Sequence, residues 1–451
     1  MFSVTKNLCA AMHLGDLDPQ HVIGRLEDRH KAVLPELGVD KELLLSEARV
    51  ARRRNVFFRL ALFIPIIWAI SIPIKYEIYA RGYQLADYLF LFIYPLLAVA
   101  AILVIKSAVV CHHLCRIVKS TPENTGEQDR QNVIIFGDFS PFAGYGYDRD
   151  GWSFTIDATK PMEDGGTAQS FGQREFLDYI ASALRKNVPQ VSIQDILFVS
   201  GRKIRNNRML LPNVKATPVS LVEKGFIDGM IGNPDLDMRH YRVISIPLAE
   251  GHIFQSFFLR STMLGGNLFF ESRSFILPPI LERFSRLVHL PEWTGTTYYL
   301  RLFVKGLLFS PVIWISGPTE VLTLIGKLQA TIVTALFGHP EDKAKIRDET
   351  YNYGHRASLR QEFSSNNFQT YFQMLDRDMA EKTCQHIIVN SMVDFLSARG
   401  IATDDIKERR TQIFNSGVIV SGGTVNAQQL AVGAGASVRS KIASKLKRAN
   451  K

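Results

Sequence analysis

The sequence has few cysteines, and its composition is that of an average globular protein. Four cysteines in 451 residues give no disulfide framework and suit a reducing compartment. Hydrophobic residues make up 46% of the chain and charged residues 21%, which excludes wholesale disorder, a collagen and a many-pass transporter. Any membrane part is therefore expected to be local. The length is enough for two or three domains with a buried core.

The sequence also lacks the common catalytic motifs. No P-loop, HExxH, GxSxG or complete GxGxxG occurs, and the segment Gly144–Gly146 lacks the third glycine of a nucleotide-binding loop. The segment Cys111–Cys115 (CHHLC) has metal-ligating residue types, but a zinc site needs four converging ligands and no second pair has suitable spacing. We therefore expect no metal and no cofactor, with Cys111 and Cys115 either buried or lipidated.

Three groups of residues are weaker candidates for chemistry. Asp148, Asp150 and Asp157 are close enough in sequence to gather around a first hairpin and to bind a metal or act as acid and base, unless they are solvated turn residues. The segments Asp237–Arg242 and Tyr353–Arg356 each place a histidine beside an arginine, as an anion site would. No partner residue is identifiable, so the catalytic residues stay unknown and the sequence favours a protein that is not an enzyme.

Two apolar runs near the N-terminus are long enough to cross a bilayer. Val56–Ile74 has nineteen residues with one charge, Arg59, near its start, where a long side chain reaches the interface. Tyr88–Ile105 has eighteen uncharged residues, and its Pro95 is acceptable in a membrane helix. We predict an N-terminal two-helix transmembrane hairpin; the alternative is a buried helical hairpin of a soluble protein.

Basic residues flank both runs. Five Lys or Arg lie in the fifteen residues before the first run and three in the fifteen after the second, whereas the loop 75–87 has two, offset by two acids. The positive-inside rule therefore places both termini in the cytoplasm. We expect Arg52, Arg53 and Arg54 to bind lipid, and the basic tail 439–451, which has no interleaved aromatic residue, to prefer anionic lipid over nucleic acid.

The remaining chain is predicted to be an α+β protein. Residues 1–55 form a cytosolic helical segment, 121–132 a polar linker, 133–280 a cytosolic domain with an antiparallel sheet, and 281–413 a helical region. Strands occur in runs rather than in alternation with helices, which is typical of the α+β class. We expect neighbouring strands at 133–137 and 152–156, a helix at 173–186, and further strands at 195–200, 242–246, 252–260 and 268–276.

The helical region contains two more apolar stretches. Leu302–Ile315 and Val321–Phe337 are interrupted by charges and split by Gly317-Pro318, so we expect core or interfacial helices; a re-entrant segment or two further passes is the alternative. Residues 341–399 are polar and helical. They end in an amphipathic piece that could face a partner through Met374, Ile387, Ile388, Met392 and Phe395.

The segment 415–438 differs sharply from its charged neighbours. It has no charged residue and combines β-branched side chains with Gly, Asn, Gln and Ser, in a weak eleven-residue repeat. Such strands can stack on copies of themselves, with Asn and Gln ladders and a dry aliphatic seam, while flanking charges act as gatekeepers. The alternative is a flexible tail. The candidate self-assembly residues are Asn415, Gly417, Ile419, Gly422, Asn426, Leu430, Val432 and Gly433.

This segment resembles the amyloid signalling motifs of bacterial and fungal immune-type proteins, which are similar to the RHIM motif of animal necroptosis. The resemblance is carried by Asn415–Gly417, Ser421–Gly423, Asn426 and Leu430–Gly433, although the animal core has Gln where this chain has Ala431. It implies self-association and a partner protein with the same motif. Separately, Asp138–Phe154 resembles a stretch of uncharacterised two-span bacterial membrane proteins, which favours a bacterial inner membrane.

Together these patterns predict a bacterial inner-membrane protein whose cytosolic domain is coupled to a self-assembling C-terminal motif, serving signalling or immune-type, anti-phage defence. Two alternatives stay open. One is a membrane-tethered enzyme with an unrecognised α+β active site, and the other is a membrane scaffold protein.

Overall fold

The computed structural model describes residues 3–79, 85–120, 131–162, 167–233, 235, 237–404 and 406. The N-terminal helices are α1 (Val4–Leu14), α2 (Pro19–Leu26), α3 (Lys41–Tyr79) and α4 (Leu85–Ser120). The sheet region follows, with β1 (Val133–Phe136), β2 (Tyr147–Asp157), α5 (Gln173–Asn187), β3 (Ser192–Ser200), α6 (Lys224–Met230), β4 (Met238–Leu248), β5 (Ile253–Leu264) and β6 (Asn267–Leu277). After two 3-10 turns come α7 (Leu290–Trp293), α8 (Thr296–Phe337), α9 (Pro340–Arg347), α10 (Leu359–Glu362) and α11 (Tyr371–Ala398).

The six strands form one sheet in the order β1-β3-β4-β5-β6-β2. All neighbours are antiparallel except β1 and β3, so the predicted α+β class with a mostly antiparallel sheet is confirmed. The expectation that the first two strands are neighbours is wrong, because β1 and β2 lie at opposite edges. The connecting loop crosses the sheet face, where its Phe142 packs 4.2 Å from the Phe258 ring and 5.4 Å from the Phe198 ring.

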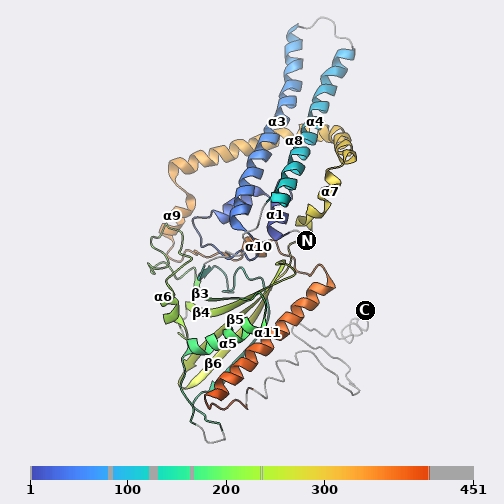
Figure 1. The fold of residues 1–451 in the computed structure, drawn as a ribbon. Coiled ribbons are helices and arrows are strands. Elements are labelled where there is room, and N and C mark those ends of the chain that lie inside the picture. Colours follow the sequence, from blue (N-terminus) through green and yellow to red (C-terminus); the bar gives the residue numbers. More distant parts are fainter. Residues whose placement is uncertain are drawn as a thin grey trace, which may run out of the picture.

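Helices α5 and α11 cover the other face of the sheet (Figure 1). The side chains of α5 that the sequence placed on one face, such as Phe176 and Ile180, are buried there. Ile388, Met392 and Phe395 of α11 join the same core, so this part of the amphipathic piece packs against its own sheet and α5 rather than a partner. The apolar face of the strands and the apolar faces of α5 and α11 thus pack together in one hydrophobic cluster.

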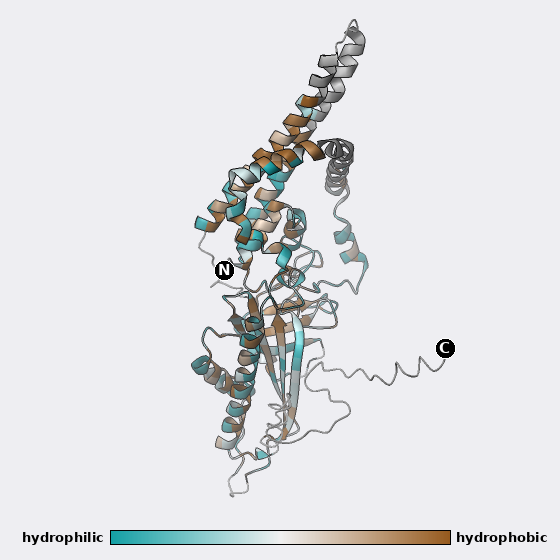
Figure 2. Cartoon of the chain, turned by 90° about the vertical axis from the view of Figure 1, so that its right-hand side faces the viewer, coloured by the Kyte–Doolittle hydropathy of each residue, from teal (hydrophilic) through white to brown (hydrophobic). Residues whose placement is uncertain are grey.

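Helices α3 and α4 lie side by side and project away from the sheet (Figure 1). Residues Ile93–Lys119 of α4 are long and apolar enough to cross a membrane by length and composition, and Pro95 lies inside this helix as predicted. The first apolar run lies in α3. The described part of this helical pair is mostly coloured hydrophobic toward its outer end in Figure 2.

The expected split at Gly317-Pro318 is wrong, because helix α8 continues through these residues and is 42 residues long. An internal proline removes one backbone hydrogen bond and favours a kink, but it does not force a helix to end. Helix α8 packs on α4, and an added Cβ on Gly306 would lie 3.0 Å from Ala100 Cα. The small residue therefore lets the two apolar helices approach closely.

Candidate functional site

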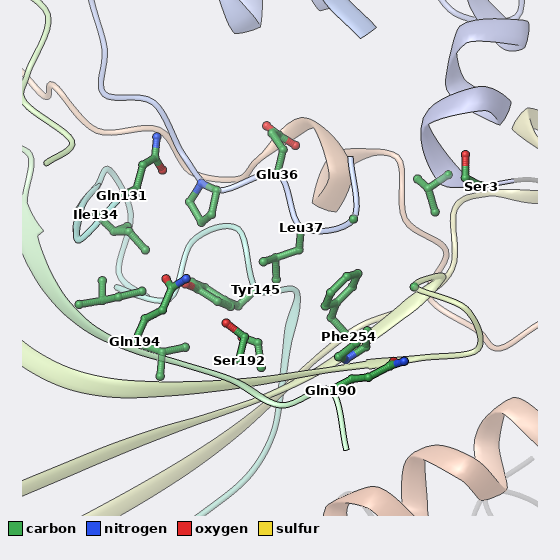
Figure 3. A pocket seen from close by; sticks show the side chains of 18 of the residues that line it. Ser3, Glu36, Leu37, Gln131, Ile134, Tyr145, Gln190, Ser192, Gln194 and Phe254 are labelled. Atoms are coloured by element: carbon green, nitrogen blue, oxygen red, sulfur yellow. The ribbon is translucent and has the colours of Figure 1, made fainter. Parts of the chain in front are cut away.

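A pocket of about 590 Å³ lies between the sheet and the segment that leads into α3 (Figure 3). Strands β3, β4 and β5 form its floor, and residues 35–38 form its roof. The lining has no histidine, cysteine, lysine or arginine among the described residues. Its polar groups are mostly amides and hydroxyls, together with the carboxylates of Glu36 and Glu250. The amides and hydroxyls are those of Gln131, Gln190, Ser192, Gln194, Tyr145 and Ser245. This surface suits a polar, uncharged ligand.

The roof of this pocket is fastened to two helices. Helix α3 begins at Lys41, three residues after Gly38. The carboxylate of Glu36 is buried and points to α10, where it accepts hydrogen bonds from the backbone N–H groups of Leu359 (2.8 Å) and Arg360 (2.7 Å) (Figure 3). Burial outweighs these bonds and raises the pKa of Glu36 to about 7. A ligand that displaced the roof would therefore disturb the start of α3.

A second polar cluster joins α1, α3 and α4 where they meet. Oε2 of Glu47 accepts hydrogen bonds from Nε2 of His13 (2.8 Å) and Nε2 of His113 (2.7 Å). The Arg54 guanidinium donates to Nδ1 of the same His13. Burial lowers the pKa of His13 to about 4, and although burial opposes ionisation of Glu47, the two histidine hydrogen bonds lower its pKa to about 2. We call these four residues the junction cluster.

The junction cluster has the residue types of a metal site, but its protonation favours a hydrogen-bond network. The three ligand atoms of His13, Glu47 and His113 lie within 4.8 Å of one another. A metal on Nε2 of His13 would require the ring proton on Nδ1, which faces a guanidinium that has only N–H donors. The positive charge of Arg54 also opposes a cation. The cluster is better suited to holding three helices together.

A third network lies on the helix-covered face of the sheet. Asp195 accepts two hydrogen bonds from Arg242, each 2.9 Å, and one of 2.9 Å from Nε2 of His240. Arg242 also donates to Asp178 of α5 at 2.6 Å. Although burial opposes ionisation of Asp195, the His240 and Arg242 hydrogen bonds hold its pKa well below the usual range. Because acids already partner His240 and Arg242, these two residues do not form the predicted anion site; Arg239 of the same segment lies on the opposite face of the sheet.

The comparisons with known proteins place this architecture in a family. A model of the AbeC-like domain matches residues 151–426, more than half of the chain. The chain belongs to the AbeC-like domain family. This family is associated with anti-phage abortive infection, and membership in it points to a defence-related role. No curated protein and no solved structure matches the chain.

The AbeC-like region begins in β2 and runs through α11 into the segment 415–438. It supplies the floor of the pocket from β3, β4 and β5, while residues 35–38 of the roof precede it. The junction cluster lies wholly before it. The pocket is therefore where the AbeC-like region meets the N-terminal helices.

The structure separates several residues that the sequence grouped. Asp148 and Asp157 lie at opposite ends of β2, so the three aspartates do not gather. Asp148 is 3.7 Å from Arg273, and Asp157 accepts hydrogen bonds from Thr159 in a turn. The AbeC-like chain thus has no acid cluster at its first hairpin among the described residues.

Other expected motifs have structural roles. Gly144 and Gly146 both have positive φ, and the Gln361 side chain binds the backbone of both, so they serve the turn rather than a phosphate. His355 accepts a hydrogen bond from Arg25 and lies 3.6 Å from Asp28, so the second predicted anion site is also partnered by an acid. In the segment Cys111–Cys115, His113 belongs to the junction cluster, while Cys111 Sγ lies 3.8 Å from the Trp293 carbonyl oxygen.

The remaining predicted site residues stay predictions. Arg52 and Arg53 are exposed, whereas Arg54 belongs to the junction cluster. The basic tail and most of the linker 121–132 lie outside the described residues, as does the whole of the candidate self-assembly motif, residues 415–438.

Proposed function

We propose that this AbeC-like chain is a bacterial inner-membrane protein that acts in anti-phage defence, and that its segment 415–438 transmits the signal by self-assembly. The observation that carries the proposal is the family match over residues 151–426. The apolar length of α4 and the uncharged Gly-, Asn- and Gln-containing segment support the membrane and assembly parts. Binding partners are the lipid bilayer, other copies of the chain, and a protein with the same C-terminal motif.

The pocket supports a binding protein rather than an enzyme. Its described lining offers mainly amides and hydroxyls, and no histidine, cysteine or lysine that would act as base or nucleophile. Of its two carboxylates, Glu36 is turned away toward α10 and Glu250 is exposed in the turn between β4 and β5. In this proposal the occupant of the pocket moves residues 35–38, and the shift reaches α3 and the junction cluster. Self-assembly of the C-terminal segment is the output.

We expect both termini to lie in the cytoplasm, because the two apolar runs are flanked by five and three basic residues. The check is a pair of reporter fusions after Lys451, one active only in the cytoplasm and one only in the periplasm. We expect activity from the cytoplasmic reporter alone. A periplasmic signal from this position would overturn the topology.

We expect cells that express the chain to release at least tenfold fewer phage than cells carrying the same plasmid with a disrupted start codon. In abortive infection the infected cells stop growing, so growth at high phage dose should stop as well. The measurement is phage yield and culture density over a diverse set of phages. Equal yields across the whole set, with the chain present in membranes, would contradict a defence role.

A further inference from the structure

The two central strands of the sheet, β4 and β5, separate toward one end of the sheet. The opening between them lies on the face that α5 and α11 do not cover. Strand β4 continues to Met238 and β5 to Leu264, but their pairing ends at Arg242–Leu259. Beyond that point β4 pairs only with β3, and β5 only with β6. A pocket of about 390 Å³ lies at this fork. It is lined by Gly151, Trp152, Ser153, Arg239, Arg260, Phe269, Glu271 and Arg273.

The fork pocket has an excess of positive charge. Its lining contains three arginines and one carboxylate, Glu271. Glu271 is already bound by neighbours, since it accepts a hydrogen bond from the Tyr241 hydroxyl (3.3 Å) and lies 3.5 Å from Nε of Arg273. Asp148 also lies 3.7 Å from Arg273, so the three arginines exceed the acids beside them by one positive charge, which an anion would balance.

Arg260 is the unusual member of this set. It is only 8% exposed, yet no hydrogen bond or ion pair joins its guanidinium to another residue in the described part of the chain. It lies opposite Glu271 in the sheet register, but that carboxylate turns to Tyr241 and Arg273. A largely buried guanidinium without a hydrogen-bonded acid is costly, and because Arg260 lines the fork pocket, an anion bound there would supply the missing counter-charge.

We propose that the fork pocket binds a small phosphate-bearing molecule, with Arg260 at its centre and Arg239 and Arg273 at its rim. Guanidinium groups match the oxygen geometry of phosphate and bind it in a bidentate manner. Phe269, on the same face as Glu271 and Arg273, offers a ring for an organic part of the molecule. The fork is distinct from the pocket beneath residues 35–38, because Arg260 lies six residues along β5 from Phe254, about 20 Å away.

The test uses the full chain purified in detergent, titrated by calorimetry with pyrophosphate and with a nucleoside diphosphate. We expect binding of both, weakened by salt, and at least tenfold weaker binding by Arg260→Met. Arg185→Met removes an exposed arginine from α5 and should leave affinity unchanged. If the nucleoside diphosphate binds more tightly than pyrophosphate, the ligand is an organic phosphate. If the two bind equally, the site recognises the phosphate group alone.

Thermal unfolding separates a ligand site from a structural role of Arg260. Without ligand, Arg260→Met should raise Tm, because it replaces an unpaired buried cation with an apolar side chain of similar length. Pyrophosphate should raise the Tm of the parent chain but not of this variant. Absence of binding to the parent chain, or equal affinity in Arg260→Met, would overturn the proposal.

Discussion

Replacing Ile419 or Leu430 with Asp should abolish clustering of the chain in cells and the fall in phage yield. The two residues occupy the same position in the two eleven-residue repeats. In stacked strands each added copy would place a like charge about 4.7–4.8 Å from the last, in a dry seam without counter-charges. Expression and membrane insertion should not change, because the segment follows the apolar runs by about three hundred residues.

The matched control is Ala427→Asp, which puts the same charge into the same segment. If Ala427 faces solvent beside the Asn ladder of the stacked strands, the added charge stays hydrated and the effect should be milder. Clustering is measured by fluorescence of a tagged chain, and fibre formation by seeded thioflavin binding of a peptide covering residues 411–440. If Ile419→Asp and Leu430→Asp keep full clustering and defence, the segment is a tail and the enzyme or scaffold alternative gains support.

Local patterns predicted the elements of the sheet well, but not their pairing. Alternating apolar residues identified β3 to β6, and the 3.6-residue period identified α5 and its buried face. The loop after β1 leads to the opposite edge of the sheet, and its Phe142 packs on the sheet face in an aromatic cluster with Phe198 and Phe258. Nothing in the sequence next to Phe142 specifies those distant partners.

The sites were harder to predict than the fold, because their residues come from distant segments. His113 stood out in the segment Cys111–Cys115, yet its partner Glu47 precedes it by 66 residues and belongs to another helix. The sequence predicts an anion site at His240 and Arg242 because their acid, Asp195, lies on the neighbouring strand and precedes them by 45 and 47 residues. The role proposed for Arg260 has no sequence signal, since it rests on the absence of a hydrogen-bond or ion-pair partner among the described residues.

Removing the carboxylate of the junction cluster should uncouple α1, α3 and α4. In Glu47→Ala the N–H groups of His13 and His113 lose their acceptor. The cost is about 1–3 kcal/mol for the buried His13 donor, and less for His113, whose partly exposed side chain can turn to water. Because the cluster lies outside the core of the sheet, we expect hydrogen exchange to speed up in α1 and in the described part of α3 near Glu47, while β3–β5 stay protected. Defence should be lost although the sheet remains folded.

Glu42→Ala is the matched control, because Glu42 is exposed and lies five residues earlier on the same helix. Its removal should change Tm, hydrogen exchange and phage yield little, as expected for a surface carboxylate. Both variants are compared with the parent chain in detergent and in infected cells. If Glu47→Ala keeps full defence with unchanged protection of α1, the junction cluster does not transmit the signal, and the path from the pocket to the helices must run through residues 35–38 alone.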